Sequence, residues 1–418
     1  MTTINNLPIE ILSHIFWLAV LDAQRPCGRI LKKGYIDPWF TSEYQATAPF
    51  VFLKVCGHWR AVARSTPLLW STLNVSNYRF DKGTCHPLPL NALVHWLSLS
   101  ELALLNLYLT SPHGDNGPEL PLGHTEQILQ LLARNGHRWQ SLSVFIDARM
   151  CQALEDIILH QLAQDAFPNF RRLELDTTAA RETFDWSTLA QAVSRINSLK
   201  ELYLVGECLR SPDYALQGIQ WGHLTTIFLD VPVTVDEAAF YLAHSTTAET
   251  VTFNFLLWTD PNVPYPQHTT LPCLKSLTLS GSDESHRLLD VFDFPSLENL
   301  SIRITMPRSP LPHALSLNDL MERSRCPLKN LLIVLCCTLS PSDAAEYLLN
   351  SRLHNVPQVV LACDYICGEV EDIARTFKKG VPPIWVWEVK AKGTQNMGWK
   401  QEFDKHLDKG ARIINSDS

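Results

Sequence analysis

A six-residue pattern of apolar positions recurs along most of this 418-residue chain. An apolar residue is followed by two residues of any type, a second apolar residue, one residue of any type and a third apolar residue, as in the segment LKELYL that begins at Leu199. The last two apolar positions lie two residues apart, so they point to one face of a short strand. One such strand cannot bury that face alone, whereas stacked strands bury a continuous core. The pattern therefore predicts a ladder of short strands.

The spacing of this motif indicates how the strands are connected. Between Phe170 and Leu297 successive motifs begin roughly 23 to 29 residues apart, and repeats of about 20–29 residues carrying L-x-x-L-x-L are the mark of leucine-rich repeats. Helical segments lie between the motifs, which favours an irregular α/β solenoid with a curved parallel sheet. The motif begins at Trp70, Leu102, Trp139, Phe170, Leu199, Leu224, Ala248, Leu274, Leu297, Leu328 and Val356.

The first 20 residues follow helical spacing instead. Apolar residues recur at i, i+3 and i+4, and further apolar residues occupy the opposite side of the same helix. A helix that is apolar nearly all round is buried on both sides, and so short a segment at a chain end does not find both partners within itself. This pattern indicates a partner protein. The first side carries Pro8, Ile11, Leu12, Ile15, Phe16 and Ala19, and the opposite side Ile9, Trp17 and Val20.

Two further segments complete the N-terminal region. Residues 22–48 are punctuated by Pro26, Gly28, Gly34 and Pro38, which predicts a long inserted loop. A second apolar stripe then predicts one helix that ends at Thr66-Pro67. This stripe consists of Phe52, Val55, Cys56, Trp59, Val62 and Ala63.

The N-terminal region resembles an F-box domain. The family pattern is L-P-x-E-[IL]-L, a later V-C-basic-x-W-R and a closing P-x-L-W. This chain has LPIEILSHIF from Leu7 and APFVFLKVCGHWRAVARSTPLLW from Ala48, with His58 a mild departure near the tryptophan. The match covers about residues 4–75. An F-box domain is a three-helix module that binds a Skp adaptor, which in turn joins a cullin scaffold in a ubiquitin ligase.

The resemblance implies which residues bind the adaptor. Those expected to face it are Leu7, Pro8, Ile11, Leu12 and Ile15, with Val55, Cys56 and Trp59 completing the module. The alternative is that these side chains form the core of the helical module, and for Val55 and Trp59 both assignments remain open.

The strand residues between the repeat leucines point away from the core, so they form an open face of the sheet. Exposed aromatic residues are common at protein-binding hot spots, which makes Tyr203 and Phe228 candidate target-binding residues; the alternative is that they only fill space between strands. Toward the C-terminus the face becomes apolar, with Leu332, Val334 and Val360. A strand apolar on both sides is covered on both sides. Here the cover is either a target protein or the tail at 393–418, with Trp399 and Phe403 as its apolar residues.

Composition narrows the function. A net charge of -8 and a pI near 6.0 argue against a nucleic-acid-binding chain, and neither a signal peptide nor a membrane span is expected. Eleven scattered cysteines indicate a reduced protein of the cytoplasm or nucleus. Cys363 and Cys367 lack a second pair at metal spacing, and nucleotide-binding, metalloprotease and nucleophile motifs are absent. No metal, cofactor or catalytic residue is therefore expected.

Together these features predict an F-box module at 1–75, a repeat array at 76–392 and a tail or cap at 393–418. The predicted protein is a non-enzymatic substrate-recognition subunit of a Skp–cullin–F-box ubiquitin ligase, with the repeats binding an unknown protein target. Two alternatives are a scaffold that binds the Skp adaptor without assembling a ligase, and an unrecognised enzyme within 76–392.

Overall fold

Parallel strands separated by helices form the main architecture of the computed structural model. The described residues are 4, 7–24, 48–76, 78–81, 84–87, 89–110, 122–145, 154, 156, 167–177, 186–206, 216–258, 268–306, 314–339, 353, 356–366, 385–389 and 412–413. The chain divides into two units. Unit 1 comprises Met1–Lys200 and Val205–Ile219, and unit 2 comprises Glu201–Leu204 and Gln220–Ser418. Both units are mixed α/β structures, as the sequence predicts, and in the described residues no helix is long and apolar enough to cross a membrane.

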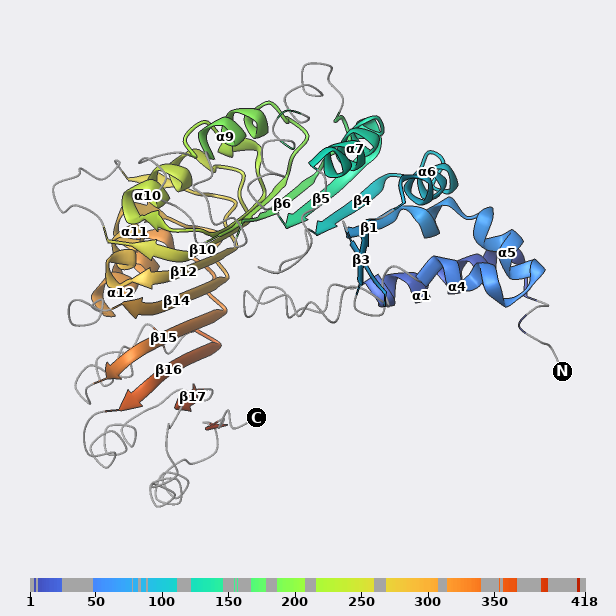
Figure 1. Ribbon diagram of the computed structural model, residues 1–418. Helices are drawn as coiled ribbons and strands as arrows, with labels where there is room; N and C mark the ends of the chain where they lie inside the picture. The colour runs from blue at the N-terminus through green and yellow to red at the C-terminus, as the bar shows by residue number, and fades with distance from the viewer. Residues whose placement is uncertain are drawn as a thin grey trace. The chain divides into compact units, whose positions relative to one another are not determined.

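Unit 1 begins with helices and continues into a parallel ladder in the order β1-β4-β5-β6. Helices α6 and α7 lie side by side along one face of these strands (Figure 1). The elements are α1 (Ile9–Gln24), α4 (Ala48–Val55), α5 (Gly57–Arg64), η2 (Pro67–Trp70), β1 (Thr72–Ser76), the β2–β3 hairpin (Tyr78–Asp81, Thr84–Pro87), α6 (Leu90–Leu99), β4 (Leu105–Thr110), α7 (Leu122–Ala133), η3 (Gly136–Arg138), β5 (Trp139–Phe145), β6 (Arg172–Asp176) and α9 (Trp186–Ser194).

Aromatic rings join the N-terminal helices to the first strands. The Phe16 ring of α1 stacks on Phe52 of α4, with ring centroids 4.1 Å apart. Further along, Trp70 and Trp96 meet edge to face at 5.5 Å, and Trp96 Nε1 donates a hydrogen bond to the Trp70 carbonyl at 2.9 Å. Large aromatic surfaces with satisfied N–H groups are strong sources of core stability. Phe50 of α4 lies against both tryptophan rings, with centroids 5.4 and 5.1 Å away, so the N-terminal helices and α6 share one aromatic core within unit 1.

Two predictions about the N-terminal helices are wrong. Helix α1 continues to Gln24, so the helix includes the first residues of the predicted loop; residues 25–47 lie outside the described part of the chain. The apolar stripe after the loop forms two helices rather than one. Cys56 is extended, with φ -157° and ψ 173°, and its Sγ accepts a hydrogen bond from the Trp59 N–H at 3.4 Å. An extended residue with such a bond is a helix N-cap, so α5 starts anew at Gly57.

Unit 2 continues the pattern in the order β7-β8-β10-β12-β14-β15-β16-β17-β18, with β9 beside β10. Helices α10, α11 and α12 follow one another along one face of β10, β12 and β14 (Figure 1). The elements are β7 (Glu201–Val205), η4 (Trp221–His223), β8 (Thr226–Asp230), β9 (Val233–Thr234), α10 (Val235–His244), β10 (Thr250–Leu257), β11 (Thr269–Thr270), β12 (Ser276–Ser282), η5 (Asp283–His286), α11 (Arg287–Val291), β13 (Phe292–Asp293), β14 (Asn299–Met306), α12 (Ala314–Ser324), β15 (Asn330–Leu339), β16 (Gln358–Ile366), β17 (Trp385–Val389) and β18 (Arg412–Ile413).

The repeated apolar motif forms the core of both units. In each motif the fourth and sixth positions lie on a strand, and in most motifs the first lies two residues before it, as with Leu224, Ile227 and Leu229 around β8. The exceptions are Leu102, three residues before β4, and Trp139, the first residue of β5. Wherever burial is described, these positions are buried, with one exception. Leu102 is 86% exposed, although Leu105 and Leu107 of the same motif are buried. The first position of this motif therefore lies outside the core, while its two strand positions belong to it.

A buried arginine accompanies this exception. Arg138 is 5% exposed and its guanidinium donates to the Ala103 and Ser100 carbonyls and to Ser100 Oγ, at 2.9, 3.2 and 2.6 Å. A buried cation requires partners of this kind, and burial lowers the Arg138 pKa. Hydrogen bonds from Arg138 thus hold the turn before β4. The turn therefore does not depend on burial of an apolar side chain at residue 102.

A further apolar position lies three residues before most motifs. Here the first motif residue donates its N–H to the carbonyl three residues earlier, as Leu199 does to Ile196 at 3.1 Å and Leu297 does to Phe294 at 3.1 Å. The upstream side chain is buried in these turns. Each strand is therefore preceded by a tight turn whose own apolar residue joins the core. The upstream residues of this kind are Phe167, Ile196, Trp221, Leu271, Phe294 and Leu353.

Candidate protein-binding surfaces

Helix α1 carries an exposed apolar stripe beside its buried one. Leu12 is 0% exposed, and Phe16 and Val20 continue its buried row at i+4 spacing. Ile11, which is adjacent to Leu12 in the sequence, is 50% exposed, and Ile15 is 38% exposed. Residues at i, i+4 and i+7 lie on one helix face, so the exposed side chains share a stripe. That stripe consists of Pro8, Ile11, Ile15 and Leu18.

The other residues predicted to bind the adaptor take different positions. Leu7 is half-buried just before α1, and Val55 is 53% exposed at the end of α4. Cys56 caps α5, while the half-buried Trp59 ring packs against Phe16 with centroids 4.8 Å apart. Cys56 and Trp59 therefore have structural roles within the helices, whereas Val55 presents apolar surface to solvent. Leu12, fully buried, contributes to the core of unit 1.

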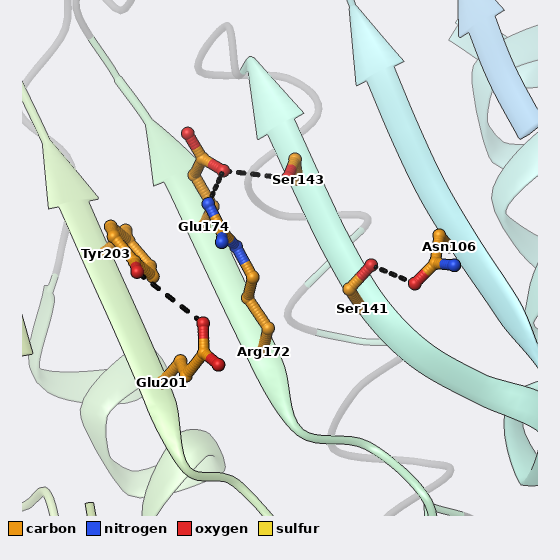
Figure 2. A network of polar contacts seen from close by, with 7 residues as sticks. All are labelled: Asn106, Ser141, Ser143, Arg172, Glu174, Glu201 and Tyr203. Atoms are coloured by element: carbon orange, nitrogen blue, oxygen red, sulfur yellow. Dashed lines mark hydrogen bonds and ion pairs between the residues drawn. The ribbon is translucent and has the colours of Figure 1, made fainter. Parts of the chain in front are cut away.

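The open face of unit 1 carries a polar network. Ser141 Oγ donates to Asn106 Oδ1 at 2.7 Å, and Ser143 Oγ donates to Glu174 Oε2 at 2.9 Å. Arg172 Nη2 lies 3.1 Å from the same Glu174 oxygen. Figure 2 shows these side chains projecting from the same side of neighbouring strands. The register places them in adjacent rows, because Asn106 pairs with Ser141 and Ser141 with Arg172.

Tyr108 lies on the same face, beside Ser143 in the register. Burial raises the pKa of Tyr108, the positive charge of Arg172 lowers it and the negative charge of Glu174 raises it. The phenol therefore stays protonated to a higher pH than an ordinary tyrosine, and it is a hydrogen-bond donor at neutral pH. Together the face presents hydroxyl and amide groups around an ion pair whose charges offset each other.

The open face of unit 2 begins with an aromatic pair. The rings of Tyr203 and Phe228 lie with centroids 5.7 Å apart and are tilted by 32°. Both side chains are half-buried, and Tyr203 Oη donates to Glu201 Oε2 at 3.5 Å (Figure 2). The two residues that the sequence singled out thus form one cluster. Whether they bind a target stays a prediction.

Beyond this pair the face changes to hydroxyl groups and then to aliphatic groups. In register, Phe228 is followed by Thr252, Thr278, Ser301, Leu332 and Val360 on successive strands. Leu332, Val334 and Val360 are half-buried and form the aliphatic end. The register brings these three predicted residues together on β15 and β16. Trp399 and Phe403, the alternative cover for this patch, lie outside the described residues.

A group of buried polar side chains surrounds η5 in unit 2. Asp283 is 3% exposed, and its carboxylate accepts a hydrogen bond from Trp258 Nε1 at 3.1 Å. His286 Nδ1 lies 2.6 Å from the Asp283 carbonyl. Ser285 Oγ is buried without a hydrogen-bond partner. Nucleophilic catalysis needs a hydroxyl bonded to an imidazole that an acid orients. The group does not have this arrangement; Asp283 instead ties the end of β10 to η5.

Several features were missed from the sequence. The candidate binding residues predicted on the open face start at Tyr203, although the same alternation rule applied to β4 and β5 places Asn106, Tyr108, Ser141 and Ser143 on an open face as well. The signal was therefore present in the motifs at Leu102 and Trp139. The contact of Trp96 with Trp70 had no comparable signal, because it joins residues that are distant in sequence.

Neither a search for metal-binding groups nor comparison with known proteins assigns a function to any residue. Among the described residues, no group of three or more His, Cys, Asp or Glu side chains is placed to hold a metal ion; Cys363 lies on β16 and Cys367 outside the described residues. No protein-family model matches the chain, and no curated protein matches it.

Proposed function

We propose that this chain is the substrate-recognition subunit of a Skp–cullin–F-box ubiquitin ligase. In this proposal the N-terminal helices are an F-box module that binds a Skp adaptor, and the parallel strand ladder is an irregular leucine-rich-repeat solenoid that binds a protein target. The chain itself performs no bond chemistry. It holds the target near a ubiquitin-loading enzyme that the cullin scaffold recruits.

The observation that carries the proposal is the distribution of exposed apolar residues. Of the twelve large hydrophobic residues that are exposed in the described chain, eight lie between residues 4 and 68. A concentration of exposed apolar side chains marks an interaction surface. These eight are Ile4, Ile9, Ile11, Ile15, Leu18, Val51, Val55 and Leu68. The same segment carries the L-P-x-E-I-L and P-x-L-W patterns that resemble an F-box, so the exposed surface and the resemblance point to one partner.

The test is adaptor capture by the full chain. Ile11→Glu and Ile15→Glu place a charge in the exposed stripe of α1 and should each weaken Skp adaptor binding by at least about 30-fold, because buried interface anchors contribute about 2 kcal/mol or more. The matched control is Val94→Glu on α6, since Val94 is 49% exposed and Ile11 is 50% exposed. Unchanged adaptor binding in both stripe variants refutes the proposal.

A second measurement separates the ligase from the scaffold alternative. The wild-type chain, adaptor and cullin are mixed and passed through a sizing column. A complex containing all three supports the ligase. A stable complex of chain and adaptor that excludes the cullin supports the scaffold and refutes the ligase assignment.

A further inference from the structure

The open face of unit 2 carries a band of hydroxyl groups without internal partners. Across the described residues, six Thr and Ser side chains on β8, β10, β12 and β14 make no hydrogen bond through their hydroxyls. All six are half-buried. They are Thr226, Thr250 and Ser276 in one row, and Thr252, Thr278 and Ser301 in the next.

The band contains no charged side chain. The first row continues to Asn299 and Asn330 and the second to Leu332, so between β8 and β15 both rows hold only hydroxyl, amide and apolar groups. Charged residues occur in the third row, where Arg303 pairs with Ser280. A partner lying on the band would therefore meet hydrogen-bonding groups but no counter-ion. Burying a charge under such conditions is unfavourable, so the band selects an uncharged partner segment.

Apolar groups lie at both ends of the band. Phe228, in ring contact with Tyr203, occupies the β8 end, and Leu332 with Val360 occupies the β15 and β16 end. Four strand steps of about 4.8 Å separate Phe228 from Leu332, which gives a span of about 19 Å. An extended peptide covers that span with about six residues at about 3.3 Å each.

We infer that this face binds an extended, uncharged segment of the target protein, lying across the strands. The segment has two apolar anchor residues about six positions apart, one against Tyr203 and Phe228 and the other against Leu332 and Val360. Its backbone N–H and C=O groups between the anchors bond to the Thr and Ser hydroxyls. A helix fits this face less well, because its backbone groups are already bonded within the helix and would leave the hydroxyls unsatisfied. The inference rests on the proposed function as a target receptor.

The probe is a displayed library of random 12-residue peptides, selected against the full chain. Selected peptides should share two apolar positions five to seven residues apart, with Lys, Arg, Asp and Glu depleted between them. Dissociation constants are then measured for synthetic copies of the selected peptides. Each of Thr252→Val and Thr278→Val keeps the side-chain shape and should weaken binding about 3- to 10-fold by removing one hydrogen bond.

Anchor variants complete the test. Phe228→Ser and Leu332→Ser should each weaken peptide binding by more than about 10-fold, whereas Val94→Ser, which removes exposed apolar surface in unit 1, should not change it. The inference is overturned if no peptide is selected, if charged residues are common between the anchors, or if the Thr variants bind as tightly as wild type. Binding of the Skp adaptor is measured on the wild-type chain and on the same variants. If the wild-type chain binds the adaptor but selects no peptide, this inference alone is overturned. If the wild-type chain does not bind the adaptor, the proposed function is refuted.

Discussion

Two adjacent residues of α1 allow stability to be separated from adaptor binding. Leu12 is 0% exposed and Ile11 is 50% exposed, although the F-box resemblance assigns both to the adaptor interface. Truncating a fully buried leucine to alanine removes apolar burial and leaves a cavity, which costs about 2–5 kcal/mol. Truncating Ile11 removes surface that is already half in water and introduces a better helix former, so its effect on folding should be within about 0.5 kcal/mol.

The effect on binding should run the other way. Ile11→Ala should weaken the Skp adaptor complex by about 30-fold, because an apolar anchor at an interface contributes about 2 kcal/mol. Leu12→Ala should weaken adaptor binding only to the extent that it reduces the population of the folded N-terminal helices. Leu12→Met should bind the adaptor nearly as tightly as wild type, since Leu-to-Met exchanges conserve volume.

The assay must report on the N-terminal helices rather than on the whole chain, because a protein with more than one unit does not always unfold in a single step. Hydrogen exchange of the amides in α1, α4 and α5 provides this local measure, and calorimetric titration with the adaptor gives the affinity. If Leu12→Ala leaves exchange unchanged while affinity falls, or if Ile11→Ala accelerates exchange by an amount typical of a core residue, the assigned orientation of α1 is wrong.

Two other substitutions test features of the strand ladders. Gly281→Ala should destabilise unit 2 by more than about 2 kcal/mol in thermal unfolding, because φ is +137° and a Cβ there would collide with the backbone of β10; Gly57→Ala, with nothing within 4 Å of its Cβ, is the neutral control. The pKa of Tyr108 is raised in the folded protein above its ordinary value of 10.0. Its contribution to the free energy of unfolding is therefore fully present below pH 10.0 and is lost as the pH rises through the folded-state pKa. Glu174→Gln should lower that pKa, and a tyrosinate absorbance titration that shows an increase instead would contradict the assignment.

The strand ladder could be predicted because its signal is local. An apolar residue two positions from another on a strand must share its face, and buried pairs such as Leu277 and Leu279 follow that rule along the chain. The exposure of Leu102 falls outside this rule, because Leu102 precedes β4. Arg138 holds that turn by hydrogen bonds, and no spacing rule reveals which distant side chain performs this role.

The helix boundaries were less predictable. The stripe from Phe52 to Ala63 keeps helical spacing even though α4 ends at Val55. Both short helices pack against α1, as the contacts of Phe16 with Phe52 and Trp59 show. Gly57 was the available warning, since glycine is unfavourable inside a helix. The orientation of α1 depended in turn on these partners, so the sequence alone left Leu12 and Ile11 equivalent.

The residues proposed to bind partners differ from the core residues in what folding requires of them. The core positions of each motif are fixed by the need to bury apolar surface between strands and helices, whereas the outward rows are only half-buried and the stripe of α1 is exposed. Substitutions such as Thr252→Val or Ile11→Ala should therefore leave the fold intact. Loss of binding in such variants can be attributed to the surface itself. Since Ile11 belongs to unit 1 and Thr252 to unit 2, the adaptor and target functions can be removed one at a time, and a variant that loses both would indicate that the two binding events are coupled.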